Sequence, residues 1–195
     1  MRTFIAVDLR NTEKIASLQD LIINQHKFNA HYFRPIPQDN LHLTIRFLGE
    51  TTDAYVEEII TNLQYLRFES FEARFVTIGC FPQCTNPRII WLGLDDKSIK
   101  ELNNLYHIVM KLLKEAKGVS IESQFYTHSE KDGFIPHLTI FRANRHIRLL
   151  KPLDFNHNNI YYNTNIDEIK LKKSILTSEG PIYSDLLTIE ANLRK

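Results

Sequence analysis

One tetrapeptide occurs twice in this chain of 195 residues, as His-Leu-Thr-Ile at 42–45 and again at 137–140. Alternate side chains of an extended strand point to the same face, so each copy puts its histidine and threonine on one face and its two apolar residues on the other. Each copy also follows a segment with strand and helix patterns. We therefore predict a divergent duplication in which two equivalent strands each present an imidazole beside a hydroxyl.

The rest of the chain alternates short strand-like and helix-like segments and contains no low-complexity linker. Apolar stripes at helical spacing predict helices that begin after Asn11 or Thr12, after Thr52 or Asp53, and at Asp96, the last ending near Gly118. Strands are predicted at 4–8, 41–48, 71–78, 88–94, 134–142, 169–176 and 182–189, and a long loop at 119–133. Strands outnumber helices without regular alternation, which favours an α+β fold with largely antiparallel sheets. We expect residues 1–195 to form a single domain.

The charge balance argues against a partner such as long nucleic acid. The 24 Lys and Arg residues against 23 Asp and Glu leave a formal charge of +1, so no overall basic field would hold a polyanion, and a small or terminal anionic substrate fits better. No stretch has the length of a signal peptide or a membrane span. We expect a soluble, cytoplasmic monomer without membrane contact, in which Cys80 and Cys84 are reduced thiols.

The two His-x-Thr strands suggest phosphate chemistry. An imidazole has a reference pKa of about 6.5, so one neutral and one protonated ring can act as base and acid near neutral pH. The two threonine hydroxyls can donate to the non-bridging oxygens of the same phosphate. The chain has no His-Glu-x-x-His, glycine-rich phosphate loop or paired carboxylate motif, so we expect no metal, ATP or dinucleotide cofactor. This chemistry leaves open which histidine is the acid.

With these two motifs, the sequence resembles the two-histidine phosphoesterases, and within them the bacterial-type RNA 2′,3′-cyclic phosphodiesterases, also called 2′-5′ RNA ligases. The two motifs lie in similar segments at 40–50 and 136–142, and the other similar segments are 81–82, 87–93 and 178–183. The resemblance implies a bilobed, pseudo-duplicated fold. In it, two mostly antiparallel sheets flank a central cleft, helices lie on the outside, and each sheet contributes one motif strand.

The resemblance also implies an activity, namely metal-independent hydrolysis of RNA 2′,3′-cyclic phosphate ends to 2′-phosphates, with reversible 2′-5′ RNA ligation as a second reaction. It implies that His42 gives a proton to the leaving 3′ oxygen and that His137 takes one from water. Thr44, Thr139 and Arg142 would hold the phosphate of an RNA end or a small cyclic nucleotide. Two alternatives stay open. One is the same chemistry on a 2′-5′ oligonucleotide or a cyclic nucleotide-sugar phosphate, and the other is an RNA-end binding module without turnover.

The arginines near the motifs pose a geometric question. Arg142 follows Thr139 by three residues, so strict alternation would turn it to the opposite face, and a bulge or strand end is required between them. Arg46 follows Thr44 by two residues and would share its face, where we interpret it as a solvated charge at a strand end.

The aromatic residues raise a second question. The family often carries a tryptophan just before the first motif, where this chain has Pro35, so another ring would have to stack on a base. We expect Trp91 in the core. The candidates for stacking are Tyr126, Phe134 and Phe47.

Overall fold

The computed structural model describes residues 1–26, 33–115, 134–143, 160–178 and 180–192. Its elements are β1 (Arg2–Asp8), α1 (Glu13–His26), β2 (Phe33–Pro35), the 3-10 helix η1 (Gln38–Asn40), β3 (His42–Glu50), α2 (Asp53–Leu63), β4 (Phe71–Phe81), β5 (Ile89–Leu94), α3 (Asp96–Glu115), β6 (His137–Ala143), β7 (Tyr162–Ile166), β8 (Glu168–Thr177) and β9 (Gly180–Glu190). The predicted loop at 119–133 and the stacking candidate Tyr126 lie outside the described residues.

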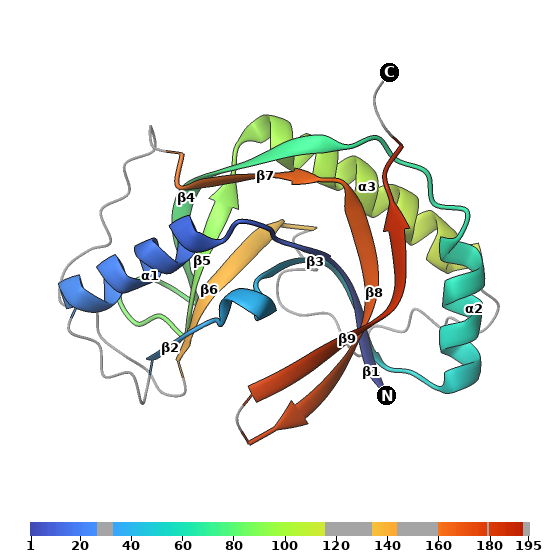
Figure 1. Cartoon of the computed structure of the whole chain (residues 1–195), viewed down its shortest axis with the longest axis horizontal. Helices are drawn as coiled ribbons and strands as arrows, with labels where there is room; N and C mark the ends of the chain where they lie inside the picture. Colours follow the sequence, from blue (N-terminus) through green and yellow to red (C-terminus); the bar gives the residue numbers. More distant parts are fainter. Residues whose placement is uncertain (27–32, 116–133, 144–159, 179, 193–195) are drawn as a thin grey trace.

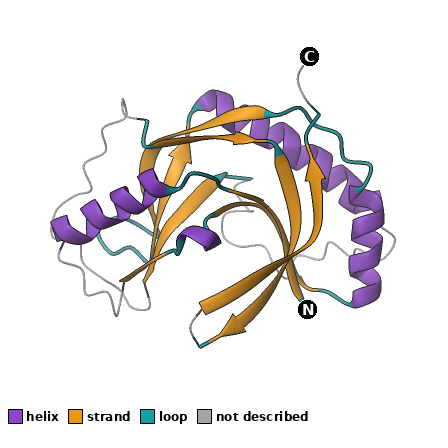
Figure 2. Ribbon diagram, viewed as in Figure 1, coloured by secondary structure: helices purple, strands orange, loops and turns teal. Residues whose placement is uncertain are grey.

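The strands of the described residues form one curled sheet, in the order β7-β4-β5-β6-β3-β1-β8-β9, with β2 added beside β6 (Figures 1 and 2). Every pairing between these strands is antiparallel. Helices α2 and α3 follow the outer side of the curl, and α1 lies against β6 toward its other end (Figure 1). This confirms the α+β class with largely antiparallel strands.

The two predicted sheets are joined into one, but only at a single residue pair. Strands β3 and β6 meet at Leu43 and Leu138, which occupy the same position of the two tetrapeptides. An antiparallel contact between equivalent residues has a local two-fold axis, which relates the two tetrapeptides, with β3-β1-β8-β9 on one side of this point and β6-β5-β4-β7 on the other. Each of the two strands carries a bulge at the last residue of its tetrapeptide, Ile45 in β3 and Ile140 in β6, and a bulge bends the strand.

The apolar residues of both tetrapeptides are buried on one face of the sheet. Leu43, Ile45, Leu138 and Ile140 belong to one core cluster together with apolar residues from all three α-helices. Helix α2 begins as predicted behind Thr52, whose hydroxyl accepts a hydrogen bond from the Tyr55 amide at 3.3 Å. Burial of one face therefore leaves the histidines and threonines on the other.

Three features of the fold differ from the predictions or were missed. No sequence pattern indicated β2, which has three residues and ends at Pro35, or β7, whose Tyr-Asn-Thr-Asn-Ile is mostly polar. The expectation of reduced thiols is wrong, because Cys80 and Cys84 form a disulfide. The chain turns at the end of β4 and brings their Cα atoms to 5.0 Å, within the range a disulfide spans. None of the described helices has the length and apolar character needed to cross a membrane.

Candidate active site

The four polar residues of the two tetrapeptides are arranged about the local two-fold axis. Leu43 pairs with Leu138, and the antiparallel register continued by one residue on each side puts His42 opposite Thr139 and Thr44 opposite His137. All four are half-buried, whereas the leucines between them are fully buried on the other side. We call the face of the sheet that carries these four residues the site face.

The two imidazoles are held in the same way. His42 Nδ1 lies 2.8 Å from the carbonyl oxygen of Asn40, and His137 Nδ1 lies 3.0 Å from that of Ile135. A carbonyl only accepts, so Nδ1 carries the hydrogen in both rings and donates it to the residue two positions earlier. This fixes each ring and leaves Nε2 as the atom that takes or gives a proton.

Burial sets the protonation of both rings. Loss of solvent lowers the pKa of His42 and of His137 below the ordinary value of 6.5, and the nearby charge of Arg142 lowers both further. The carbonyl bonds act in the opposite direction, because a protonated ring donates more strongly. In the free protein both rings are therefore mainly neutral at pH 7.

Arg142 reaches this site because β6 contains the required bulge. In the pairing of β5 with β6, Ile90 lies opposite Phe141 and Trp91 opposite Thr139, which leaves Ile140 without a partner residue. The extra residue restores Arg142 to the face of Thr139. The Ile140 carbonyl accepts hydrogen bonds from the buried Gln19 side chain of α1 at 2.8 Å and from the Ile36 amide at 3.0 Å. The bulge is thus fixed from the helix side of the sheet.

Strand β3 has a bulge at the equivalent residue, Ile45, and it overturns the prediction for Arg46. The register pairs Ala6 with Thr44 and Ile5 with Arg46, so the arginine turns away from the site face. There its charge acts on Tyr55 of α2. Burial raises the pKa of Tyr55, and the charge of Arg46 lowers it. Strict alternation failed because the bulge is invisible in the tetrapeptide itself.

Comparison with known proteins identifies the family. A family model described as LigT like Phosphoesterase matches residues 11–91. A relative from Aeropyrum pernix, named RNA 2′,3′-cyclic phosphodiesterase, is 31% identical over 161 residues, which cover 81% of this chain and 86% of the relative. The chain belongs to the LigT-like phosphoesterase family. A second relative of the same name, from Archaeoglobus fulgidus, is 29% identical over 97% of this chain and 100% of its own length.

Solved structures share the fold of this LigT-like phosphoesterase. A Thermus thermophilus protein superimposes with a TM-score of 0.75 at 24% identity, over 97% of both chains. E. coli LigT in complex with phosphate gives a TM-score of 0.65 at 22% identity, over 97% of this chain and 96% of that one. At these identities the likeness concerns the fold alone.

Aromatic rings line the half of the site that carries His137. The Phe81 ring centroid lies 5.4 Å from that of His137, edge to face, and Phe81 stacks on Trp91 at 5.2 Å. The expectation that Trp91 lies in the core is wrong, because Trp91 is half-buried on the site face, cross-strand from Thr139. Its indole lies flat over Gly79 of β4, where an added Cβ would come within 2.1 Å of the ring. Gly79 is therefore part of how this LigT-like phosphoesterase positions the ring.

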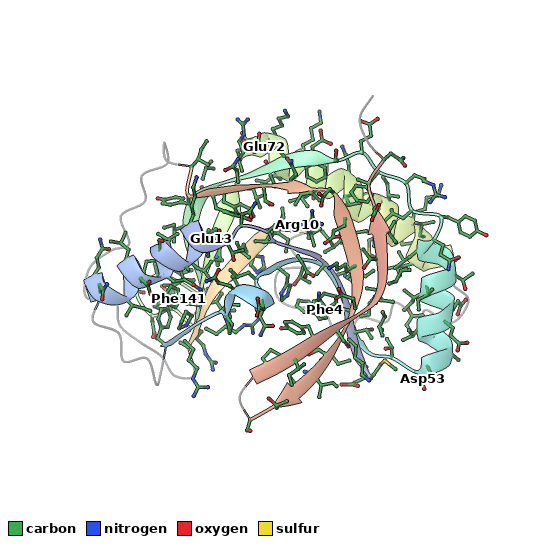
Figure 3. The ribbon with its side chains drawn as sticks, in the orientation of Figure 1. Phe4, Arg10, Glu13, Asp53, Glu72 and Phe141 are labelled. Atoms are coloured by element: carbon green, nitrogen blue, oxygen red, sulfur yellow. A yellow bond between two sulfur atoms is a disulfide. The ribbon has the colours of Figure 1, made fainter. Side chains whose placement is uncertain are left out.

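The half that carries His42 also has aromatic neighbours. Phe4 and Tyr183 place their ring centroids 5.1 and 5.3 Å from the imidazole of His42 (Phe4 is labelled in Figure 3). Of the predicted stacking residues, Phe47 is 44% exposed with its centroid 6.1 Å from Phe4, whereas Phe134 stacks on a ring of α3. Phe47 occupies the position in its strand that Arg142 occupies in β6, three residues after the threonine.

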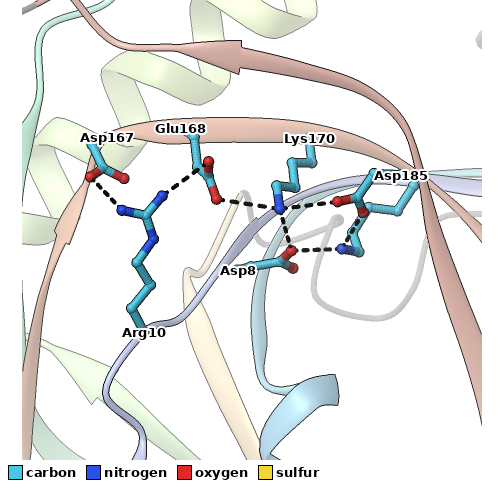
Figure 4. Close-up of polar contacts among 7 residues, drawn as sticks. Asp8, Arg10, Asp167, Glu168, Lys170 and Asp185 are labelled. Carbon is cyan, nitrogen blue, oxygen red and sulfur yellow. Dashed lines mark hydrogen bonds and ion pairs between the residues drawn. The ribbon is translucent and has the colours of Figure 1, made fainter.

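A network of ion pairs beside His42 joins Asp8 of β1, Lys170 and Lys172 of β8, and Asp185 of β9 (Figure 4). Asp8 is the cross-strand partner of His42, and its carboxylate binds the ammonium groups of Lys172 at 2.7 Å and Lys170 at 3.0 Å. Asp185 binds the same two lysines at 2.6 and 3.0 Å. The only local sign of this network in the sequence is the alternation of Lys170 and Lys172 in β8, which does not predict it, since Asp8 and Asp185 lie elsewhere in the chain.

The network acts on the imidazole in two directions. The carboxylate of Asp8 raises the pKa of His42, against the larger effect of burial, and the ammonium of Lys172 lowers it. No group of three or more His, Cys, Asp or Glu side chains in the described part of this LigT-like phosphoesterase is arranged to hold a metal ion.

Proposed function

We propose that this protein hydrolyses the 2′,3′-cyclic phosphate ends of RNA to 2′-phosphates, with its two tetrapeptide strands as the catalytic centre. One observation carries the proposal. The strands pair at the equivalent residues Leu43 and Leu138, so the residues that carry two imidazoles and two hydroxyls occupy neighbouring positions on the site face. The two relatives named RNA 2′,3′-cyclic phosphodiesterase support the choice of substrate.

The proposed reaction is an in-line displacement at phosphorus. His137 Nε2 accepts a proton from water while the water oxygen bonds to phosphorus. The bond from phosphorus to the ribose O3′ breaks, and His42 Nε2 donates its proton to that oxygen, which leaves the phosphate on O2′. Asp8 supports His42 as the acid, because a neighbouring carboxylate favours the protonated ring.

The remaining residues of the proposed site stabilise charge. Negative charge builds up on the non-bridging phosphate oxygens during the displacement, and preorganised donors lower the barrier. We assign this role to the hydroxyls of Thr44 and Thr139 and to the guanidinium of Arg142, all on the site face. Once bound, the phosphate favours protonation of one imidazole by its negative charge and offsets the effect of burial.

Turnover of 2′,3′-cyclic AMP with and without a chelator tests the reaction. We expect the chelator to leave the rate unchanged and the product to be adenosine 2′-phosphate, identified by phosphorus NMR. Loss of activity on chelation would contradict the metal-free step. Formation of adenosine 3′-phosphate would contradict the assigned leaving oxygen, and absence of turnover would contradict hydrolysis itself.

We further propose that the protein acts as a monomer in the cytoplasm and binds RNA ends or small cyclic nucleotides. The nearly balanced charge of the chain supports recognition of an end over binding along a polyanion. Light scattering after size-exclusion chromatography is expected to give the mass of one chain, 22.9 kDa. A mass of twice this value would contradict the monomer.

A further inference from the structure

Two arginines lie directly opposite each other in the sheet beside the proposed catalytic centre. Strand β2 pairs with β6 so that Arg34 faces Arg142, between the pairs Phe33 with Ala143 and Pro35 with Phe141. Residues directly opposite in an antiparallel pair point to the same face, with their Cβ atoms roughly 5 Å apart. The two guanidinium groups therefore start from neighbouring positions.

Both arginines belong to the site face. The rings of Phe33 and Phe141 stack at 4.6 Å on the core side and are fully buried. The residues next to them in each strand, Arg34 and Arg142, consequently point the other way and are exposed. Arg142 is close enough to both catalytic histidines for its charge to lower the pKa of each.

The pair is electrostatically unfavourable as it stands. Like charges directly opposite in a sheet destabilise it. Within the described residues, neither guanidinium has a salt bridge to an Asp or Glu, in contrast to Arg10 and Arg74, which are both paired. Two planar donors side by side match the oxygens of a phosphate, which would remove the repulsion.

The order of residues along β6 indicates which phosphate this is. Strands β3 and β2 pair with β6 in succession, so His42 lies opposite Thr139 and Arg34 comes next, opposite Arg142. His42 is the proposed donor to the leaving O3′, so the ribose of the cyclic nucleotide lies on its side of the phosphorus. In the proposed complex, the O5′ of that ribose extends along β6 in the direction from Thr139 to Arg142, toward Arg34.

We propose that Arg34 and Arg142 form a second anion site, which binds the phosphate on O5′ of the nucleotide that carries the cyclic phosphate, with the five N–H donors of Arg142 shared between this phosphate and the cyclic one. In an RNA end this is the last phosphodiester, and in a mononucleotide it is a 5′-phosphate. The inference rests on the proposed function, since it uses His42 as the acid. It makes Arg34 a specificity residue that distinguishes RNA ends from a bare cyclic nucleotide.

Three substrates test the site: 2′,3′-cyclic AMP, its 5′-phosphorylated form, and the dinucleotide ApA with a terminal 2′,3′-cyclic phosphate. We expect Arg34→Gln to raise KM roughly five- to twentyfold for the latter two, because one charge-assisted contact is lost. For cyclic AMP we expect kcat/KM to change by less than about twofold. The slope of log KM against log salt for the dinucleotide should fall by about one. If only the dinucleotide responds, the site takes the diester alone, which still supports the inference for RNA.

The matched control is Arg67→Gln, which removes the same charge from an exposed position near the end of α2 and should leave all three substrates unchanged. Equal effects of Arg34→Gln on all three substrates, or no effect on any, would overturn the second anion site. Calorimetry measures the affinity of Arg34→Gln and of Arg67→Gln for adenosine 2′,5′-bisphosphate and for 2′-AMP, and this measurement needs no turnover. If the wild type hydrolyses none of the substrates, the proposed function fails, while this binding measurement still decides on the arginine pair.

Discussion

The two halves of the site have the same framework but different surroundings. In both, the histidine Nδ1 binds the carbonyl two residues earlier, the threonine follows on the same face, and a bulge comes directly after. Both imidazoles have aromatic neighbours, but the carboxylate of Asp8 and the ammonium of Lys172 act on His42 and not on His137. The repeat thus fixes where two titratable groups stand, and the unrepeated residues make them chemically unequal.

The strongest test of the shared framework is removal of each imidazole in turn. We expect His42→Ala and His137→Ala each to lower kcat for 2′,3′-cyclic AMP by roughly 10²–10⁴-fold, because each removes one proton transfer from the displacement. Affinity for 2′-AMP should weaken far less, since the other donors remain. Near-full activity in either variant would break the equivalence of the two halves.

A second test sharpens the difference on the His137 side. Gly79→Ala puts a methyl group where the Trp91 indole now lies, and we expect kcat to fall roughly tenfold as the ring is displaced against Phe81 and His137. Trp91→Ala removes the obstruction, so adding Gly79→Ala to it should cost little more. If the two losses are additive, the glycine acts through something other than the indole.

The sequence was informative where the relevant geometry is local. The two tetrapeptides predicted the site face, and the spacing from Thr139 to Arg142 predicted that a bulge was needed. It was misleading where a residue depends on distant partners. The bulge at Ile45 that turns Arg46 away, and the glycine of β4 that admits Trp91 to the site face, are set by neighbouring strands. Alternation within β3 does not reveal the bulge, and alternation within β5, although it turns Trp91 away from Ile90 and Leu92, does not reveal the space over Gly79.

The same limit explains the residues that were missed entirely. Gln19 reaches the Ile140 carbonyl from a helix 121 residues earlier, and Asp8 meets Lys172 across a separation of 164 residues. Such polar contacts leave no periodicity in the sequence, because each member is a single residue in an otherwise ordinary element. They become visible only when the sheet order is known.

The smallest expected effect concerns the charges on the His42 side, and it is directional. Burial lowers the pKa of both histidines below 6.5, and an acid–base pair is most active between its two pKa values, so the bell-shaped profile of kcat/KM should centre below pH 6.5. Asp8→Asn removes the carboxylate that raises the pKa of His42, so the centre should shift to lower pH. Lys172→Met removes the ammonium that lowers it, so the centre should shift to higher pH.

Opposite shifts separate an electrostatic role from a structural one. Charges face His42 from Asp8 of β1, Lys172 of β8 and Arg142 of β6, with Tyr183 of β9 beside the ring. Both variants break the same 2.7 Å salt bridge, so a purely structural defect would move the two profiles in the same direction or lower them without a shift. Arg10 binds Asp167 and Glu168, and Glu168 in turn binds Lys170 of the network, so Arg10→Met breaks salt bridges far from His42 and should leave the centre unchanged. At pH 8 we expect a loss of roughly three- to tenfold in kcat/KM for Asp8→Asn and none for Lys172→Met, because only the first makes His42 harder to protonate.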